Sequence, residues 1–260
     1  MTQLELIISN LKSKPEIDAV FVTGSHGIGE GKNYSDIDLG IVINTETDLK
    51  SLFQWVDDKP LEVHFFSRVQ LERTIKSDHI SPNDYEGLIV GFLEKADIKF
   101  DKTGTLQNIK NKYEEIHKKL QVPQSKMIWF DGIINWAYVI NKRYFDSDKP
   151  EYKESLEIKL LGDLDLLLKG YFEFRNIPWK GEKQVVKYLK ENDPTFYDLY
   201  MLCIRTTSMT EKFPIYSDLV KRTYCGNYKL WNKEVIFPSA SNQSVERQKQ
   251  LVEFWKKLIS

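Results

Sequence analysis

Two aspartates, Asp36 and Asp38, stand two positions apart in a segment that otherwise reads as a β-strand. Side chains at i and i+2 of a strand share one face, roughly 6 to 7 Å apart, so both carboxylates point the same way and repel each other. A divalent cation bound between them would relieve this repulsion. Oxygen ligands at this spacing suit Mg²⁺, which keeps part of its water shell and takes substrate phosphates as further ligands.

A third carboxylate follows on the next predicted strand, where apolar residues of the segment 61–66 alternate with Glu62 and His64. Two cations about 3.5 to 4 Å apart, held by acids from neighbouring strands, serve in-line attack on a phosphate. We therefore predict that Asp36, Asp38 and Glu62 are metal ligands. The alternative for Glu62 and His64 is the solvated face of a half-buried strand, and for the aspartates it is an exposed edge strand.

Glycines precede this acidic pair, but they do not form either of two common phosphate loops. A Walker A loop needs Ser or Thr after Gly-Lys, whereas Asn33 follows Lys32; the glycines at 27–31 are spaced by two, which fails the dinucleotide fingerprint. What remains is the pair Gly24 and Ser25 at the end of a predicted strand. Their backbone amides and the serine hydroxyl could hold phosphate oxygens.

These elements resemble the signature of the nucleotidyltransferase superfamily of DNA polymerase β. That signature is Gly-Ser or Gly-Gly, a spacer of about ten residues, Asp-x-Asp, and a third acid on a later strand. The chain carries these parts in order, as Gly24, Ser25, Asp36, Asp38 and Glu62. The α/β part followed by helices looks most like the bacterial aminoglycoside and lincosamide nucleotidyltransferases.

The resemblance implies a reaction and its cofactors. A nucleoside monophosphate would pass from an ATP-like nucleoside triphosphate, bound with two Mg²⁺ ions, to a hydroxyl of a small-molecule acceptor, and pyrophosphate would be released. Gly24 and Ser25 would bind the triphosphate. Modification of an antibiotic, and hence antibiotic resistance, is an expectation by analogy with the resembling enzymes.

Two residues of the helical part complete the predicted site. In the resembling enzymes a carboxylate there can take the acceptor's proton, and Asp131 lies on an apolar helix face, where burial would raise its pKa. The alternative is a buried aspartate satisfied by Asn135 or a lysine. Lys183, at the end of the stretch 177–183 that resembles a segment of the relatives, could steady the triphosphate or could simply be a solvated helix residue.

The sequence patterns around these residues predict the elements that position them, which are a small mixed sheet and its helices. We expect a capped helix from Thr2, a helix after Thr47 carrying apolar residues at 49, 52, 53 and 56, and helices after Ser67 and Ser81. Strands are expected at 18–24, 35–43, 61–66 and 96–101. Residues 1–105 would form the nucleotidyltransferase domain.

From residue 106 onward a helical period dominates, and breaks fall at prolines and polar turns. The expected helices are 106–121, 124–145, 151–175, 181–191, 194–207, 214–224 and 243–258. Residues 106–260 are thus predicted to be an all-α bundle that binds the acceptor. The fold class is α/β (α+β) followed by this bundle.

Composition limits the remaining possibilities for this chain of 260 residues, of which 41% are hydrophobic. The net charge of −1 argues against a dedicated nucleic-acid binder. No signal peptide or membrane span is apparent, so we expect a cytoplasmic protein; a monomer and a homodimer both stay open. Cys203, Cys225 and four scattered histidines lack zinc-site spacing, so oxygen ligands are expected for any metal.

Two other function classes compete with the small-molecule enzyme. One is an antitoxin-type nucleotidyltransferase acting on a protein partner, which copurification of a small helical protein would favour. In minimal relatives of this domain the protein partner is a helical ribonuclease that carries an Arg-x4-6-His motif. The helical part of this chain lacks that motif, because no histidine follows His117. The other is a non-catalytic nucleotide-binding regulator, which would be attractive if Glu62 lay away from the aspartates.

Overall fold

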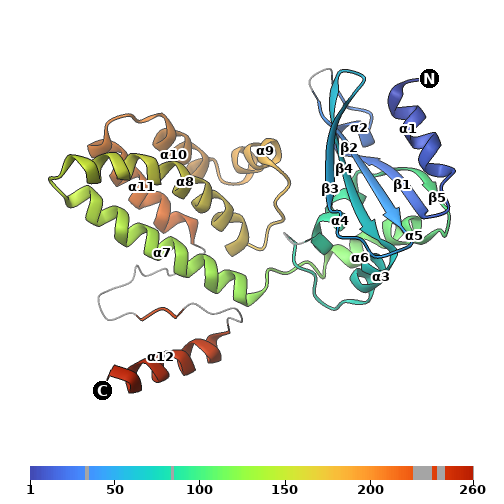
Figure 1. Cartoon of the computed structure of the whole chain (residues 1–260). Helices are drawn as coiled ribbons and strands as arrows, with labels where there is room; N and C mark the ends of the chain where they lie inside the picture. The colour runs from blue at the N-terminus through green and yellow to red at the C-terminus, as the bar shows by residue number, and fades with distance from the viewer. Residues whose placement is uncertain (33–34, 83–84, 225–235, 239–243, 260) are drawn as a thin grey trace. The chain divides into compact units, whose positions relative to one another are not determined.

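The computed structural model divides into two compact units, Met1–Gln121 and Val122–Ser260 (Figure 1), and each is described by itself. The first unit is α/β and the second is helical. The structure describes residues 1–32, 35–82, 85–224, 236–238 and 244–259. Among these residues, no helix combines the length and apolar character needed to cross a membrane.

The first unit is built on a mixed sheet, as expected. Its strands are β1 (Ile17–Thr23), β2 (Ile37–Ile43), β3 (Ser51–Val56), β4 (Lys59–Ser67) and β5 (Asp97–Asp101). They follow the order β3-β4-β2-β1-β5 across the sheet. The β2–β4 pair is parallel, and the neighbouring pairs are antiparallel. The centre of the sheet is therefore β2, which carries Asp38.

Helices cover both faces of this sheet (Figure 1). They are α1 (Gln3–Lys12), α2 (Gly24–Gly27), α3 (Arg68–Lys76), α4 (Tyr85–Glu94), α5 (Thr105–Asn111) and α6 (Tyr113–His117). Apolar residues of α1 pack with Val20, Leu39 and Val63 on one face. On the other face, Phe21 and Phe66 pack with residues of α3 to α6. Each fully buried side chain of this kind contributes roughly 1.5 to 3 kcal/mol.

Two of the predicted helix starts are confirmed in detail. Thr2 and Ser67 each form a capping box, in which the hydroxyl accepts a hydrogen bond from the backbone of Glu5 or Gln70 at 3.1 Å. The side chains of Glu5 and Gln70 accept from the cap backbone in return. The helix expected from Ser81 is described from Tyr85, and residues 83–84 lie outside the described residues.

The helix expected after Thr47 is wrong, because residues Ser51–Val56 form strand β3. β3 pairs with β4 through a tight turn in which Asp57 and Asp58 both have positive φ, 50° and 57°. Such a turn matches the twist of a hairpin, although Asp-Asp lacks the glycine that usually marks it. The Asp57 carboxylate also accepts hydrogen bonds from the first backbone amides of α1, at 3.0 and 3.3 Å. Pairing with β4 thus overrides the helical spacing of the apolar residues.

The second unit is an all-helical bundle, as predicted. Its helices are α7 (Gln124–Asp146), α8 (Pro150–Phe174), α9 (Glu182–Asn192), α10 (Pro194–Arg205), α11 (Met209–Thr223) and α12 (Val245–Ile259). Buried residues of α7 to α11, among them Ile134, Leu160, Phe196 and Tyr216, form one core. Cys203 is buried as well, whereas Cys225 lies outside the described residues.

Two predicted helices and the predicted domain boundary differ from the structure. The helix expected at 106–121 is divided at Lys112 into α5 and α6, and both pack into the core of the first unit. The compact units therefore divide after Gln121 and not at residue 105. Helix α11 begins before Pro214, which the sequence placed at its start. Burial of Phe213 and Tyr216 on either side of this proline offsets the backbone hydrogen bond that it cannot donate.

Candidate metal and phosphate site

One row of paired residues crosses the sheet at the end where the predicted site lies. Thr23 of β1 pairs with Asp38 of β2, Asp38 pairs with Glu62 of β4, and Glu62 pairs with Phe53 of β3. Paired residues of neighbouring strands direct their side chains to the same face. The parallel pairing of β2 with β4 thus brings two carboxylates, distant in sequence, next to each other.

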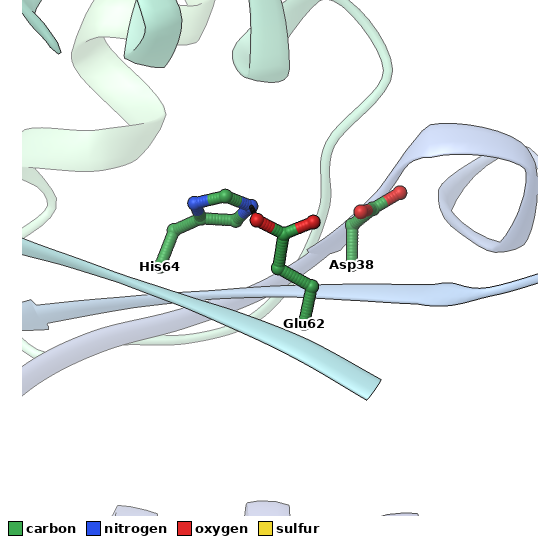
Figure 2. Close-up of side chains that lie close together, drawn as sticks. All are labelled: Asp38, Glu62 and His64. Carbon is green, nitrogen blue, oxygen red and sulfur yellow. Dashed lines mark ion pairs between the residues drawn. The ribbon is translucent and has the colours of Figure 1, made fainter. Parts of the chain in front are cut away.

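Asp38, Glu62 and His64 form a group that could hold a metal ion (Figure 2). One potential ligand atom from each residue lies within 4.8 Å of the other two. The side chains rise from the same face of two neighbouring strands, and the His64 Nε2 atom is 3.3 Å from Glu62 Oε1. The donor set therefore fits a divalent cation, with carboxylates as the ligands that Mg²⁺ prefers.

Burial sets the protonation of this group. His64 is buried and its ring lies 4.6 Å from that of Phe92, so burial lowers the pKa of His64 to about 4 and its imidazole is neutral at pH 7. Burial also raises the pKa of Glu62, and the negative charge of Asp36 raises it further. The negative charge of Asp36 thus opposes the ionisation of Glu62, and a bound cation would reverse this effect.

Gly24 brings the backbone directly against the Asp38 carboxylate. Its φ is +64°, and a Cβ atom added to it would lie 2.3 Å from Asp38 Oδ2. Only glycine takes up this conformation in this space without strain. The hydroxyl of the preceding Thr23 donates to the Phe92 carbonyl at 2.7 Å, which ties the end of β1 to α4. The Gly24–Ser25 backbone is therefore held beside one of the predicted metal ligands.

Asp36 occupies a different position from Asp38. It immediately precedes β2, its side chain is exposed, and it is not part of the group that joins Asp38, Glu62 and His64. Its charge nonetheless reaches Glu62, because it raises the pKa of that residue. Asp36 is thus exposed and affects Glu62 through its charge, whereas Asp38 is half-buried and lies in one group with Glu62.

The predicted residues of the helical unit lie on α7 and α9. Asp131 is half-buried on α7, and its Oδ1 accepts a hydrogen bond from Asn135 Nδ2 at 3.0 Å. Burial raises the pKa of Asp131, and hydrogen bonds from Tyr224 and Asn135 partly offset this increase. Lys183 is exposed in the first turn of α9. Asp131 therefore has the asparagine partner that the alternative interpretation named.

Two features of this site go beyond the metal ligands predicted from the sequence. His64 contributes a nitrogen to the group, although only oxygen ligands were expected; the signal was its position two residues after Glu62 on the same strand face. Phe53 lies beside Glu62, but its segment was predicted to be helical. Once β3 is recognised as a strand, its pairing with β4 identifies Phe53 as a neighbour of the site.

One family of known proteins matches the first unit of the chain. Residues 4–122 match the family model described as nucleotidyltransferase domain. This stretch of the chain is thus similar to the nucleotidyltransferase domain, the superfamily whose signature the sequence motif resembles. Among solved structures, a nucleotidyltransferase-like protein from Exiguobacterium sibiricum 255-15 is 11% identical, with a TM-score of 0.47, over 84% of this chain and 72% of that chain. No match was found among curated proteins.

Proposed function

We propose that the protein transfers a nucleoside monophosphate from a Mg²⁺-bound nucleoside triphosphate to a hydroxyl of a small-molecule acceptor. The observation that carries this proposal is the side-by-side position of Asp38 and Glu62 on β2 and β4, with the Gly24 backbone against the Asp38 carboxylate. The nucleotidyltransferase domain at residues 4–122 supports the reaction class.

Each residue has a separate task in this proposal. Asp36, Asp38 and Glu62 hold the metal, and two bound Mg²⁺ ions would neutralise charge that develops on the α-phosphate and on the departing pyrophosphate. The backbone amides of Gly24 and Ser25, with the Ser25 hydroxyl, bind terminal phosphate oxygens. Neutral His64 packs against Glu62 and keeps that carboxylate oriented toward Asp38.

The transfer itself makes one bond and breaks one. The acceptor oxygen forms a bond to the α-phosphorus as the bond from that phosphorus to the bridging oxygen breaks, and the electron pair leaves with pyrophosphate. The hydroxyl proton passes to a base. Asp131 is the proposed base, because burial raises its pKa toward a useful value, and Lys183 is proposed to steady the triphosphate.

A screen identifies the donor and the acceptor together. The purified chain is incubated with Mg²⁺, each of the four nucleoside triphosphates, and aminoglycosides, lincosamides or a metabolite set. Mass spectrometry should show an acceptor that gains one nucleoside monophosphate, with release of pyrophosphate. An antibiotic acceptor would support a role in antibiotic resistance.

Substitution of the aspartates tests the site assignment. Asp36→Asn and Asp38→Asn should each abolish pyrophosphate release with little effect on folding, measured by circular dichroism. Asp58→Asn is a matched control, since Asp58 is exposed in the β3–β4 turn and asparagine also tolerates its positive φ. Full turnover in either site variant would remove that residue from the metal site.

A further inference from the structure

The sheet of the first unit has two edges that differ in chemistry (Figure 1). β5 forms one edge and carries a charged residue at every second position, at Asp97, Lys99 and Asp101. Such charges keep an edge strand from pairing with another chain. β3 forms the other edge, and its residues Ser51–Val56 include neither a charged residue nor a proline. The β3 edge therefore lacks the side chains that prevent edge-to-edge pairing.

β3 also exposes large apolar side chains on both of its faces. Phe53 and Trp55 are 70% and 72% exposed, and they share the face of the metal site because Phe53 pairs with Glu62. Leu52, on the opposite face, is 40% exposed. A further strand added beside β3 would remove part of this apolar surface from water.

The hydrogen bonds of the β3–β4 hairpin determine which backbone groups of β3 point away from the sheet. The Phe65 amide donates to the Lys50 carbonyl at 2.9 Å, so every second residue from Lys50 onward bonds to β4. Trp55 falls between these residues, and its neighbour on β4 is Pro60, which has no amide hydrogen to donate. The amide and carbonyl groups of Phe53 and Trp55 therefore point outward, to the open edge.

We propose that two copies of the chain pair antiparallel through β3, about a two-fold axis at Gln54, and form one continuous sheet. The outward groups of Phe53 exchange two hydrogen bonds with those of Trp55 of the partner subunit, and the reverse pair forms by symmetry. The aromatic side chains of each pair lie side by side across the two strands, which stabilises an antiparallel sheet. The contact is isologous, because both copies use the same strand.

Charges at the ends of β3 favour this register. With Gln54 on the axis, Lys50 of one copy lies opposite Asp58 of the partner subunit, so opposite charges meet at both ends of the paired strands. An axis at Phe53 would instead place Asp48 opposite Asp58, two like charges. The assembly also closes at two copies, because both outer edges of the continuous sheet are then β5 strands with their alternating charges.

The pairing brings an aromatic residue of the second copy next to the candidate site. Thr23, Asp38, Glu62 and Phe53 form one row across the sheet, and the partner's Trp55 is the next member of that row. Dimerisation does not depend on the reaction proposed above, because it uses the backbone of β3 and not the carboxylates.

Sedimentation velocity of the full chain at increasing concentration measures the self-association. The wild type should approach twice the monomer mass of 30.6 kDa. Gln54→Lys places like charges opposite each other on the axis, so it should raise the dissociation constant of the dimer at least about tenfold. Gln250→Lys adds the same charge at an exposed position of α12 and should associate like the wild type. A wild-type chain that stays monomeric at every concentration would overturn the proposal.

A charge exchange tests the axis itself. Gln54 is exposed, so Gln54→Lys and Gln54→Glu should both fold, which circular dichroism checks. Each variant alone should associate weakly, whereas their equimolar mixture should form a mixed dimer, because opposite charges then meet on the axis. If the mixture stays monomeric, the register is wrong. If each variant dimerises like the wild type, the copies associate through another surface, such as the exposed apolar residues of α12, and β3 pairing is wrong.

Cross-linking through Gln54→Cys gives a direct measure of the distance across the axis. The Cα atoms of a non-hydrogen-bonded pair are about 4.5 Å apart, within the reach of a disulfide, so mild oxidation should join two copies. The change is made together with Cys225→Ser, and Cys203 is buried. Leu52→Cys in the same background lies two positions from the axis and should not cross-link. No disulfide in Gln54→Cys, or equal cross-linking of both variants, would contradict the pairing.

Discussion

Glu62 on the sheet and Asp131 in the helical unit are both partly buried acids, but their surroundings differ. Burial raises the pKa of each carboxyl. The second contribution to the pKa of Glu62 is the negative charge of Asp36, which raises it further. Around Asp131 the next contributions are hydrogen bonds from Tyr224 and Asn135, which lower it.

The two carboxylates differ in the groups that surround their negative charge. Asp131 obtains hydrogen-bond donors from its own unit, so its ionised form has partners without any ligand. Glu62 instead lies in one group with Asp38, and the negative charge of Asp36 opposes its ionisation; a bound cation would relieve this opposition. Burial alone therefore does not distinguish the two acids, whereas the charge and hydrogen-bond donors of the neighbouring groups do.

The largest expected effect comes from Glu62→Gln. This change removes a predicted metal ligand, so pyrophosphate release should fall at least about 100-fold. Mg²⁺ should also no longer raise the melting temperature, because a ligand stabilises only the state that binds it. Asp131→Asn is the matched control and should keep the Mg²⁺-dependent rise. The comparison fails if both variants respond to Mg²⁺ like the wild type.

A second variant disturbs the sheet site without changing its charge. In Gly24→Ala the new Cβ would meet Asp38 Oδ2 at 2.3 Å, and the φ of +64° is unfavourable for alanine, so we expect a loss of about 1 to 2 kcal/mol in unfolding free energy and impaired turnover. Gly91→Ala in α4 is the control, since no atom lies within 4 Å of the added Cβ. It should be neutral or stabilising by up to about 1 kcal/mol. Urea denaturation measures both, and equal stabilities would contradict the strain assigned to Gly24.

A smaller effect is expected from Tyr224→Phe in the helical unit. The Tyr224 hydroxyl donates to the Asp131 carbonyl at 3.3 Å and accepts from Asn135 at 3.2 Å. Its removal should cost about 0.5 to 1.5 kcal/mol and raise the pKa of Asp131 further. Tyr152→Phe, at an exposed position, should change stability by less than about 0.5 kcal/mol. If the two substitutions cost the same, the hydroxyl network does not support Asp131.

The smallest effect is a pH dependence of stability at Asp131. Because burial raises its folded-state pKa, the protonated carboxyl contributes its full stability below the unfolded-state pKa, and this contribution is lost as the pH rises through the folded-state pKa. Wild type should therefore lose stability relative to Asp131→Asn as the pH rises above about 4, the ordinary pKa of an aspartate. Urea midpoints at several pH values measure the difference. A difference of the opposite sign would mean that the hydrogen bonds outweigh burial.

Much of the first unit follows from local patterns. Thr2 and Ser67 are read correctly as caps because a capping box involves only four consecutive residues. β1 is read correctly because most of its residues are apolar, and all of them are buried. β3 is misread because most of its apolar residues face solvent, so their spacing does not mark a buried face. In addition, the Asp57-Asp58 turn lacks the glycine that usually indicates a hairpin.

In the candidate site, too, some features follow from local sequence patterns and others depend on contacts between distant segments. The alternation around Asp38 and around Glu62 assigns each carboxylate to a strand face from sequence alone, and the resemblance to the nucleotidyltransferase signature predicts that both belong to one site. The surroundings of His64 and Phe53 were not predictable from local patterns. His64 is buried against the ring of Phe92, and Phe53 neighbours Glu62 only through the pairing of β3, which was predicted to be a helix.

By itself, the order of residues established which side chains could do chemistry: strand alternation and glycine spacing are local properties, and both are visible in a single chain. Only the tertiary structure decided that Asp38 and Glu62 are paired neighbours, that Gly24 abuts one of them, and that Phe53 borders the other. The physical reason is that parallel pairing and hairpin register depend on backbone hydrogen bonds between distant segments, which the side-chain pattern of one segment does not encode.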